Sequence, residues 1–239
     1  MSTLAENVAK VTAAHAALKT AIAAKGVAVP EGTKLSGMPA LVGQISTEPE
    51  PTNPRASFAY DESASIVVPK TLVVDMMSVT NIQYFFTKNS SLTSLVLPEG
   101  FGLNAKNISG ILDGCTSITS VVFPVGFGRN AERGHSLFYG CKSLVSVHLP
   151  DGFGEKITIS LANAFYNCPN LENITGNPNF KISFDLSPCQ KLIHDSLMVV
   201  INGLQTVTTT KTLTLGSTNL AKLTDEEKKV ATDKGWTLA

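Results

Sequence analysis

Short apolar triplets recur through the middle of the chain, each followed by polar residues or a proline. The last two positions of a triplet alternate along the chain, as on one face of a β-strand, and the first lies three residues earlier. Strands this short cannot bury an apolar face alone, so the pattern predicts that they stack side by side in a parallel sheet. The triplets are Leu92/Leu95/Leu97, Ile118/Val121/Phe123, Leu144/Val147/Leu149 and, truncated, Leu171/Ile174.

The triplets belong to a longer repeat with a period of about 26 residues, which is typical of a solenoid. CTSITSVVFPVGFG begins at Cys115 and returns as CKSLVSVHLPDGFG at Cys141, with a looser copy, NSSLTSLVLPEGFG, at Asn89. Degraded copies begin at Cys168 and Cys189. The proline of each copy has no amide hydrogen and ends the strand. The Gly-Phe-Gly turn that follows predicts an aromatic column, formed by Phe101, Phe127 and Phe153.

Two stretches resemble the unit F-x-x-C-x-x-L-x-x-V-x-x-P of the BspA-like class of bacterial leucine-rich repeats. They are FYGCKSL, from Phe138 to Leu144, and FYNCPNL, from Phe165 to Leu171. The resemblance covers roughly residues 80–190. Asn89 departs from it by replacing a cysteine, and the Gly-Phe-Gly insertion makes the unit longer than is usual in that class. The resemblance implies an α+β repeat protein with a leucine-rich-repeat solenoid, which we place over residues 57–193.

All cysteines of the chain fall at one position of the repeat. No C-x-x-C or C-x-x-H pair occurs, and structural zinc sites use such pairs, so we predict no metal site. We expect a column of small buried side chains instead. Because neighbouring strands lie about 4.8 Å apart, within disulfide range, oxidised pairs are the alternative. The four residues are Cys115, Cys141, Cys168 and Cys189.

Residues 4–24 predict an alanine-rich helix with a narrow apolar seam at heptad spacing. An isolated helix of this length needs a partner. We expect a coiled-coil-like parallel bundle, a homotrimer, although the seam could also pack on the same chain. STEPEPTNPRA predicts an extended linker over residues 46–56. The seam consists of Leu4, Val8, Val11, His15, Leu18 and Ile22.

The segment KGVAVPEGTKLSGMPALVGQI, from Lys25 to Ile45, resembles a short module of bacteriophage tail and virion-associated proteins. The resemblance implies that residues 1–45 form an attachment and oligomerisation region that contacts other virion proteins.

Residues 194–239 predict a helix–strand–helix ending that caps the last repeat, as solenoids require. The first helix is expected over Asp195–Leu204, N-capped and closed by Gly203, and the strand over Thr210–Ser217.

The final helix carries signals at both ends. Thr224 and Glu227 form a T-x-x-E capping box, and Gly235 marks the end of the helix. Trp236 follows at once and is expected to fold back on the helix.

The composition predicts a folded chain without a global electrostatic preference. Of its 239 residues 43% are hydrophobic and 16% are charged, with a formal net charge of +0. We therefore expect no drive toward nucleic acid or anionic membranes. No apolar stretch is long enough for a transmembrane helix. The N-terminus lacks the basic and apolar regions of a signal peptide, which predicts a protein made in the cytoplasm.

Motifs of known chemistry are absent from the chain. It has no G-x-S-x-G elbow, no Walker loop and no H-E-x-x-H pair, and its histidines are scattered. We therefore predict neither an enzyme nor a bound cofactor.

The residues between the apolar anchors of each strand face outward, and they align in two columns. Such an array suits contact with a protein or a glycan, and a solvated face without a ligand is the alternative. Tyr139 and Tyr166 precede the cysteine column, where their rings either stack on sugars or simply pack. The two columns are Ser94, Ser120, Ser146 and Asn173, and Val96, Val122, His148 and Thr175.

Three functions fit these features. The first is a phage virion component, such as a tail fibre or receptor-binding protein, in which the helix attaches and the repeats recognise a host-surface protein or glycan. Virions leave by lysis, so this function needs no export signal. The second is a bacterial cell-surface or secreted adhesin of the BspA-like type, which needs an export signal. The third is a scaffold inside the cell.

Overall fold

The computed structural model describes residues 63–68 and 79–239. The predicted N-terminal helix with its heptad seam, the Lys25–Ile45 segment and the linker lie outside the described residues. They stay predictions. Among the described residues, none of the helices has both the length and the apolar character needed to cross a membrane.

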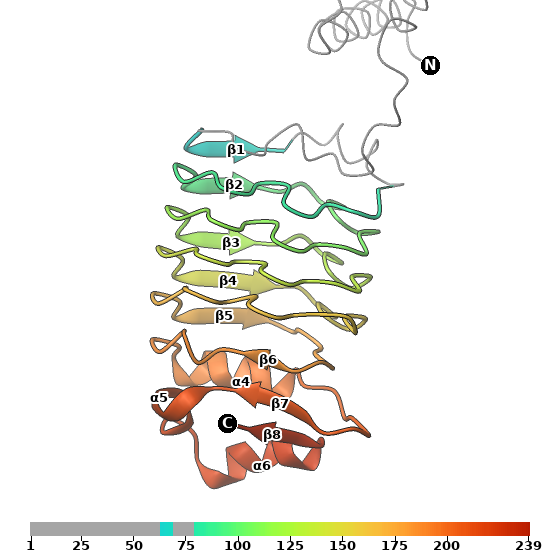
Figure 1. Ribbon diagram of the computed structural model, residues 1–239, viewed down its shortest axis with the longest axis vertical. Coiled ribbons are helices and arrows are strands. Elements are labelled where there is room, and N and C mark those ends of the chain that lie inside the picture. Colours follow the sequence, from blue (N-terminus) through green and yellow to red (C-terminus); the bar gives the residue numbers. More distant parts are fainter. Residues whose placement is uncertain (1–62, 69–78) are drawn as a thin grey trace, which may run out of the picture. The chain divides into compact units, whose positions relative to one another are not determined.

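Short parallel strands lie one above another, each from a successive copy of the repeat (Figure 1). Strand β1 (Ser65–Val67) pairs with β2 (Ser94–Val96). Strands β3 (Ser120–Val122), β4 (Ser146–Leu149) and β5 (Asn173–Gly176) form a parallel sheet in that order, and β2 contacts β3. The predicted stack of short parallel strands is confirmed.

A second ladder ties the coils together outside the strands. Parallel bridges join Asn81 to Asn107, Asn107 to Arg133 and Arg133 to Ser160. The amide of Ile82 donates to Asn107 O at 2.9 Å, and the same bond recurs one coil later. The coils of β3, β4 and β5 are therefore hydrogen-bonded to one another at two places, in the strands and at these bridges. The coils of β2 and β3 share the bridges, while their strands are in contact without pairing.

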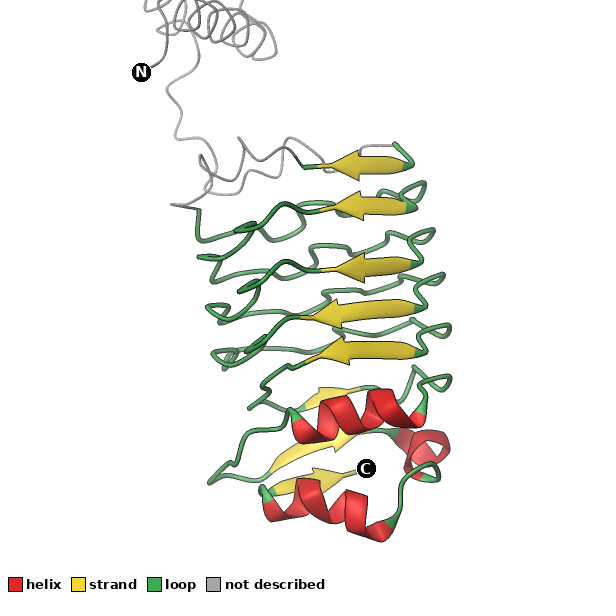
Figure 2. Cartoon of the chain, turned by 180° about the vertical axis from the view of Figure 1, so that it is seen from behind, coloured by secondary structure: helices red, strands yellow, loops and turns green. Residues whose placement is uncertain are grey.

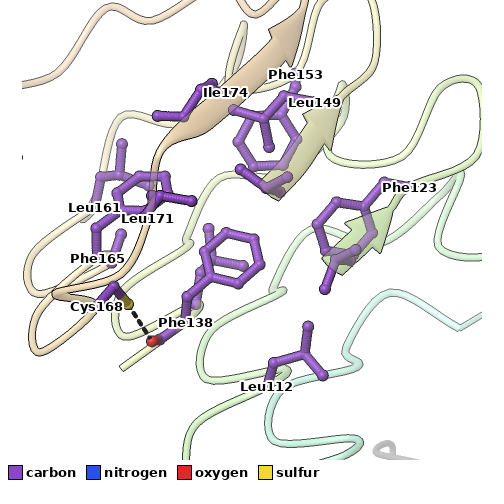
Figure 3. Packing of buried hydrophobic residues seen from close by; sticks show 14 of the residues in the cluster. Leu112, Phe123, Phe138, Leu149, Phe153, Leu161, Phe165, Cys168, Leu171 and Ile174 are labelled. Carbon is purple, nitrogen blue, oxygen red and sulfur yellow. Dashed lines mark hydrogen bonds between the residues drawn. The ribbon is translucent and has the colours of Figure 1, made fainter. Parts of the chain in front are cut away.

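The interior between the two ladders is filled by aromatic rings. Phe101 and Phe127 lie 6.3 Å apart and Phe127 and Phe153 lie 6.2 Å apart, both pairs stacked, so the predicted column is confirmed. Phe123, from strand β3's end, adds a ring 4.0 Å from Phe127. Figure 3 shows the surrounding packing, including Phe138 and the strand residues that point inward. These side chains are fully or almost fully buried.

Besides the glycines of the Gly-Phe-Gly turns, two further positions of the coils adopt the left-handed backbone conformation. Such φ values disfavour residues with a Cβ, except asparagine to some degree, and turn the chain sharply. The first position is held by Tyr84, Gly110, Ser136 and Asn163, and the second by Lys88, Gly114, Gly140 and Asn167.

The parallel pattern continues past residue 193. Strands β6 (Phe184–Asp185), β7 (Lys211–Thr214) and β8 (Trp236–Leu238) form a sheet in that order. Strand β7 is shorter than predicted, because Gly216, with φ 70, begins a helix. Strand β8 was not predicted. Trp236 does turn back, but as part of this strand, where its Nε1 donates to Gln205 O at 2.8 Å.

Three helices accompany these strands: α4 (His194–Asn202), α5 (Gly216–Leu220) and α6 (Asp225–Asp233). Figures 1 and 2 show α4 and α6 on the same face of the sheet. The capping box of α6 is confirmed, with the Thr224 side chain accepting from Glu227 N. Helix α5 is too short to have been recognised by periodicity.

The start of α4 differs from the prediction. Ile193 holds the N-cap position without a side-chain bond, and Asp195 lies in the first turn. The helix starts there because the chain is anchored by tertiary bonds: Ile193 N donates to Glu172 O at 3.0 Å. Ser196 Oγ donates to the same carbonyl and accepts from Ile174 N, each at 2.9 Å. Helix α4 is thus fastened to strand β5.

We predict that Gly128→Ala destabilises the fold more than Gly140→Ala. Both glycines have positive φ, 74 and 71, which costs a residue with a Cβ about 1–2 kcal/mol. A Cβ at Gly128 would also lie 2.4 Å from Phe153 Cδ2, whereas at Gly140 the nearest atom is 3.9 Å away. Overpacking of this kind costs about 1–3 kcal/mol more.

Denaturant unfolding of both variants would measure the difference. Gly140→Asn is the matched control, because Asn167 occupies this position one coil later. It should lower the free energy of unfolding less than Gly140→Ala does. Equal losses at positions 128 and 140 would contradict the packing described here.

Candidate interaction surface

The outward face of the strands carries the two predicted columns. Register within the sheet aligns Ser120 with Ser146 and Asn173, and aligns Val122 with His148 and Thr175. Strands β1 and β2 align Ser65 with Ser94 and Val67 with Val96 in the same way. The structure therefore aligns the predicted residues in two rows within β3 to β5 and in two rows within β1 and β2, and β2 contacts β3. The residues between the rows point into the core.

The first strand of this face, β1, was not predicted from the sequence. Ser65 and Val67 occupy the same positions in β1 as Ser94 and Val96 do in β2. The signal was present, because SIVVP at residues 65–69 repeats the pattern of SLVLP at residues 94–98. The larger spacing between these copies concealed it.

The row that contains Val96, Val122, His148 and Thr175, called the outer row below, changes its chemistry along the stack. Its first three members, Val67, Val96 and Val122, are 64%, 51% and 64% exposed. Its next two are polar, and His148 Nδ1 lies 3.1 Å from Thr175 Oγ1. The face therefore has an apolar end over β1 to β3 and a hydrogen-bonding end over β4 and β5.

Neither row contains Asp, Glu, Lys or Arg. The face thus offers small hydroxyls, an amide, an imidazole and exposed valines on a stiff backbone. Such groups suit the contact of one surface with another, because the centres of protein interfaces are depleted of charged residues.

The cysteines form the buried column that was predicted. Their thiols are free and buried, and each donates to a carbonyl of the preceding coil; Figure 3 shows the bond from Cys168 to Phe138. The bonds are Cys115 Sγ to Phe86 O (3.0 Å), Cys141 Sγ to Leu112 O (3.2 Å), Cys168 Sγ to Phe138 O (3.0 Å) and Cys189 Sγ to Phe165 O (3.6 Å). The disulfide alternative does not occur in this structure.

Burial also controls the chemistry of the thiols. It raises the pKa of Cys115 to about 12 and that of Cys168 to about 12. The pKa values of Cys141 and Cys189 are raised above the ordinary value for the same reason. All four thiols are therefore protonated at neutral pH, which makes them poor nucleophiles and poor metal ligands.

The described segments, residues 63–68 and 79–239, contain no group of three or more His, Cys, Asp or Glu that could hold a metal ion. Two hollows of about 420 Å³ lie near the C-terminal sheet, one beside Lys181 and Lys211 and the other beside Trp236. Neither is lined by His, Cys, Asp or Glu.

Part of the repeat region is similar to a known protein family. The family model of the BspA type leucine rich repeat region matches residues 110–224, in 6 copies. The repeats within residues 110–224 are thus similar to the BspA type. A search of the curated proteins and a search of the solved structures gave no match.

The match covers strands β3 to β7 and helices α4 and α5, so the BspA-type repeats extend past residue 193. It agrees with the resemblance found in the sequence and favours a role in interactions at a surface or with proteins. It does not include residues 1–45, so the resemblance of that segment to phage tail proteins has no support from it.

One exposed ion pair joins two C-terminal helices. His194 Nε2 of α4 lies 2.8 Å from Glu227 Oε1 of α6, and His194 Nδ1 lies 3.3 Å from Asp195 Oδ1. The bond to Glu227, and then that to Asp195, raises the pKa of His194 above its ordinary value. The Thr224 amide, and then His194, lowers the pKa of Glu227.

We predict that thiol-specific reagents label the native protein slowly at neutral pH. Because the folded pKa values lie above the unfolded value, the stabilisation from protonated thiols is complete below about pH 8.5. It is lost as the pH rises further. Labelling with a chromogenic disulfide across a denaturant series should follow unfolding. Ser94→Cys provides an exposed control thiol that should react at once, and rapid native labelling of any natural cysteine would refute the buried column.

We predict that His194→Gln lowers the melting temperature most between about pH 4.5 and 6.5. The stabilisation of the fold by protonated His194 is complete below the unfolded pKa of the imidazole, and it is lost as the pH rises through the raised folded pKa. The contribution of Glu227 is present above its unfolded pKa and lost as the pH falls. His194→Gln leaves the capping box of α6 intact, unlike a substitution of Glu227.

Thermal melts of the unaltered protein and of His194→Gln at several pH values would measure the difference in melting temperature. High salt should reduce it, because His194 is 47% exposed and surface pairs are screened. A difference that stays constant between pH 5 and 8 would show that the charge of His194 contributes nothing.

Proposed function

We propose that the BspA-type repeats form a non-enzymatic interaction module, which binds a partner protein on the outward face of strands β1 to β5. One observation carries the proposal: the valines at the apolar end of the face are more than half exposed, in a region whose other apolar side chains are largely in the core.

The shape and stiffness of the face support this function. Valine has few rotamers, so it loses little entropy when a partner covers it. The two hydrogen-bonded ladders hold the strands in place before binding. Exposed apolar side chains flanked by hydroxyls are typical of the centre of a protein interface, where charged residues are depleted.

The polar end of the face sets the orientation of the partner. His148 and Thr175, hydrogen-bonded to each other, still present donor and acceptor capacity to the outside. Groups like these add specificity, because a partner that buries them without bonding to them loses affinity. Since neither row holds a formal charge, binding should depend only weakly on salt.

We place this module at a cell surface, as an adhesin-like protein, because the family match favours a surface or interaction role. The virion tail-fibre function is a second candidate. It depends on the predicted homotrimeric helix and on the Lys25–Ile45 resemblance, both outside the described residues. A scaffold inside the cell is the third candidate.

The C-terminal elements act in this proposal as the cap of the stack. Lys222 Nζ donates to Gln190 O at 2.8 Å and to Leu192 O at 2.7 Å, both just before α4. Lys234 Nζ donates to Ile201 O and Asn202 O, at the C-terminal end of α4. Helix C-terminal carbonyls favour a cation, so Lys234 holds the end of α4, while Lys222 joins α5's end to the chain before α4. These bonds support a closing role for residues 194–239.

The test is binding of the full chain to whole cells, with the double variant Val96→Asp/Val122→Asp. Burying a carboxylate against a partner is costly, so we expect binding to fall at least about tenfold, as for an interface hot spot. Val125→Asp is the matched control. Val125 is 74% exposed, but it lies in the turn after β3, and its substitution should change nothing.

Treatment of the cells separates the kinds of partner. Protease treatment should abolish binding if the partner is a protein, and glycosidase treatment should not. Unchanged binding by the double variant would refute the sheet-face proposal. A panel of bacterial and animal cells without any binding would favour the scaffold function instead.

A further inference from the structure

Two tyrosines form an exposed stack at the turn that leads into the strands. The rings of Tyr139 and Tyr166 lie 5.2 Å apart with an interplanar angle of 17°. Their backbones are held by the preceding coils, since Gly114 N donates to Tyr139 O at 2.8 Å and Gly140 N donates to Tyr166 O at 2.9 Å. The stack is therefore part of the rigid solenoid, on a different part of the coil from the sheet face.

The stack stops after Tyr166. Cys189 bonds to Phe165 O as Cys168 bonds to Phe138 O, which aligns the two coils. Two residues before Cys189 the next coil has Ser187, where the two preceding coils have tyrosine. Ser187 therefore occupies the position at which a third ring would continue the stack.

A hollow lies where the stack ends. It has a volume of about 340 Å³ and is lined by Tyr166, Asn167, Pro169 and Pro188. Pro188 comes from the next coil, so the hollow extends from Tyr166 in the direction in which the third ring would continue the stack. Tyr166 is 50% exposed and Tyr139 is 39% exposed, as expected if Tyr166 is the open end of the pair.

Asn167 brings a polar group to the rim of this hollow. Its φ is 58, and the same position in the two preceding coils is held by Gly114 and Gly140. Glycine meets this conformation at the least cost, and asparagine here adds a carboxamide that both donates and accepts hydrogen bonds. No charged residue lines the hollow.

We propose that this hollow binds one neutral pyranose ring of a glycan, stacked on Tyr166 as the next ring of the column. The C–H groups on one face of a pyranose meet the negative face of an aromatic ring favourably. The Asn167 carboxamide bonds to the ring's hydroxyl groups. The uncharged lining selects a neutral sugar over an acidic one. The site is separate from the sheet face and does not depend on the function proposed for it.

A proline-rich peptide is the competing ligand, because such peptides also bind on aromatic rings. That mode uses a groove with successive aromatic pockets along an extended peptide. Here Tyr139 is stacked with Tyr166 and does not line the hollow. A single ring position fits one sugar residue better than an extended chain.

The experiment is saturation-transfer difference NMR on the full chain with the methyl glycosides of glucose, galactose, mannose and N-acetylglucosamine. We expect transfer to the ring protons of at least one glycoside. Tyr166→Ala should weaken its binding about tenfold or more, which is about 1.4 kcal/mol. Tyr166→Phe, which keeps the ring, should retain most of the binding.

Two further variants separate binding from folding. Asn167→Gly removes the carboxamide but installs the residue found at Gly114 and Gly140, so it should weaken binding while the melting temperature stays unchanged. Tyr139→Phe preserves the stack and should bind as well as the unaltered chain. Val96→Asp/Val122→Asp, on the sheet face, should leave glycoside binding unaffected.

The outcomes decide between the ligands. Absence of transfer to every glycoside overturns the proposal, and so does binding that survives Tyr166→Ala. If a proline-rich peptide binds in a Tyr166-dependent manner and displaces the glycoside, the hollow is a peptide site. If Val96→Asp/Val122→Asp abolishes cell binding but leaves glycoside binding normal, the sheet face and the hollow beside Tyr166 are separate binding sites.

Discussion

Hydrogen bonding of each coil to its neighbours is the constraint on which the rest of this structure depends. A single coil is too short to bury its apolar side, and its backbone groups need partners outside the coil. Both needs are met by placing identical positions of successive coils above one another. The ladder through the strands and the second ladder through Asn107 and Arg133 fix that alignment. Columns of like residues follow from it.

These columns explain most of the repeated residues. Phe127 stacks between Phe101 and Phe153 because any other vertical order would break the ladders. A cysteine serves in its column because its side chain is small, tolerates burial and has a thiol that reaches the carbonyl of the coil before it. In the first copy Asn89 takes this place, and its Nδ2 donates to Ser63 O at 3.1 Å. The bond to the preceding coil is kept while its chemistry changes.

Departures from the repeat are where the surface acquires individual features. The outer row of the sheet face changes from valines to His148 and Thr175, which gives it two chemically different ends. The tyrosine stack ends because Ser187 replaces an aromatic residue, and the hollow lies at this break. At the C-terminus β6, β7 and β8 form a separate parallel sheet, and helices α4 and α6 accompany its strands.

The sequence by itself determined the period, the short parallel strands, the phenylalanine and cysteine columns, the two outward rows and the capping box of α6. All of these depend on local alternation, on spacing between copies or on residues within one turn of helix, so they can be read along the chain. Only the tertiary structure decided that Ile193 caps α4, that Trp236 enters a strand, that His194 meets Glu227, and that a hollow opens beside Tyr166. Each of these depends on contacts between residues about 20 or more positions apart without a periodic pattern, which a single sequence does not display.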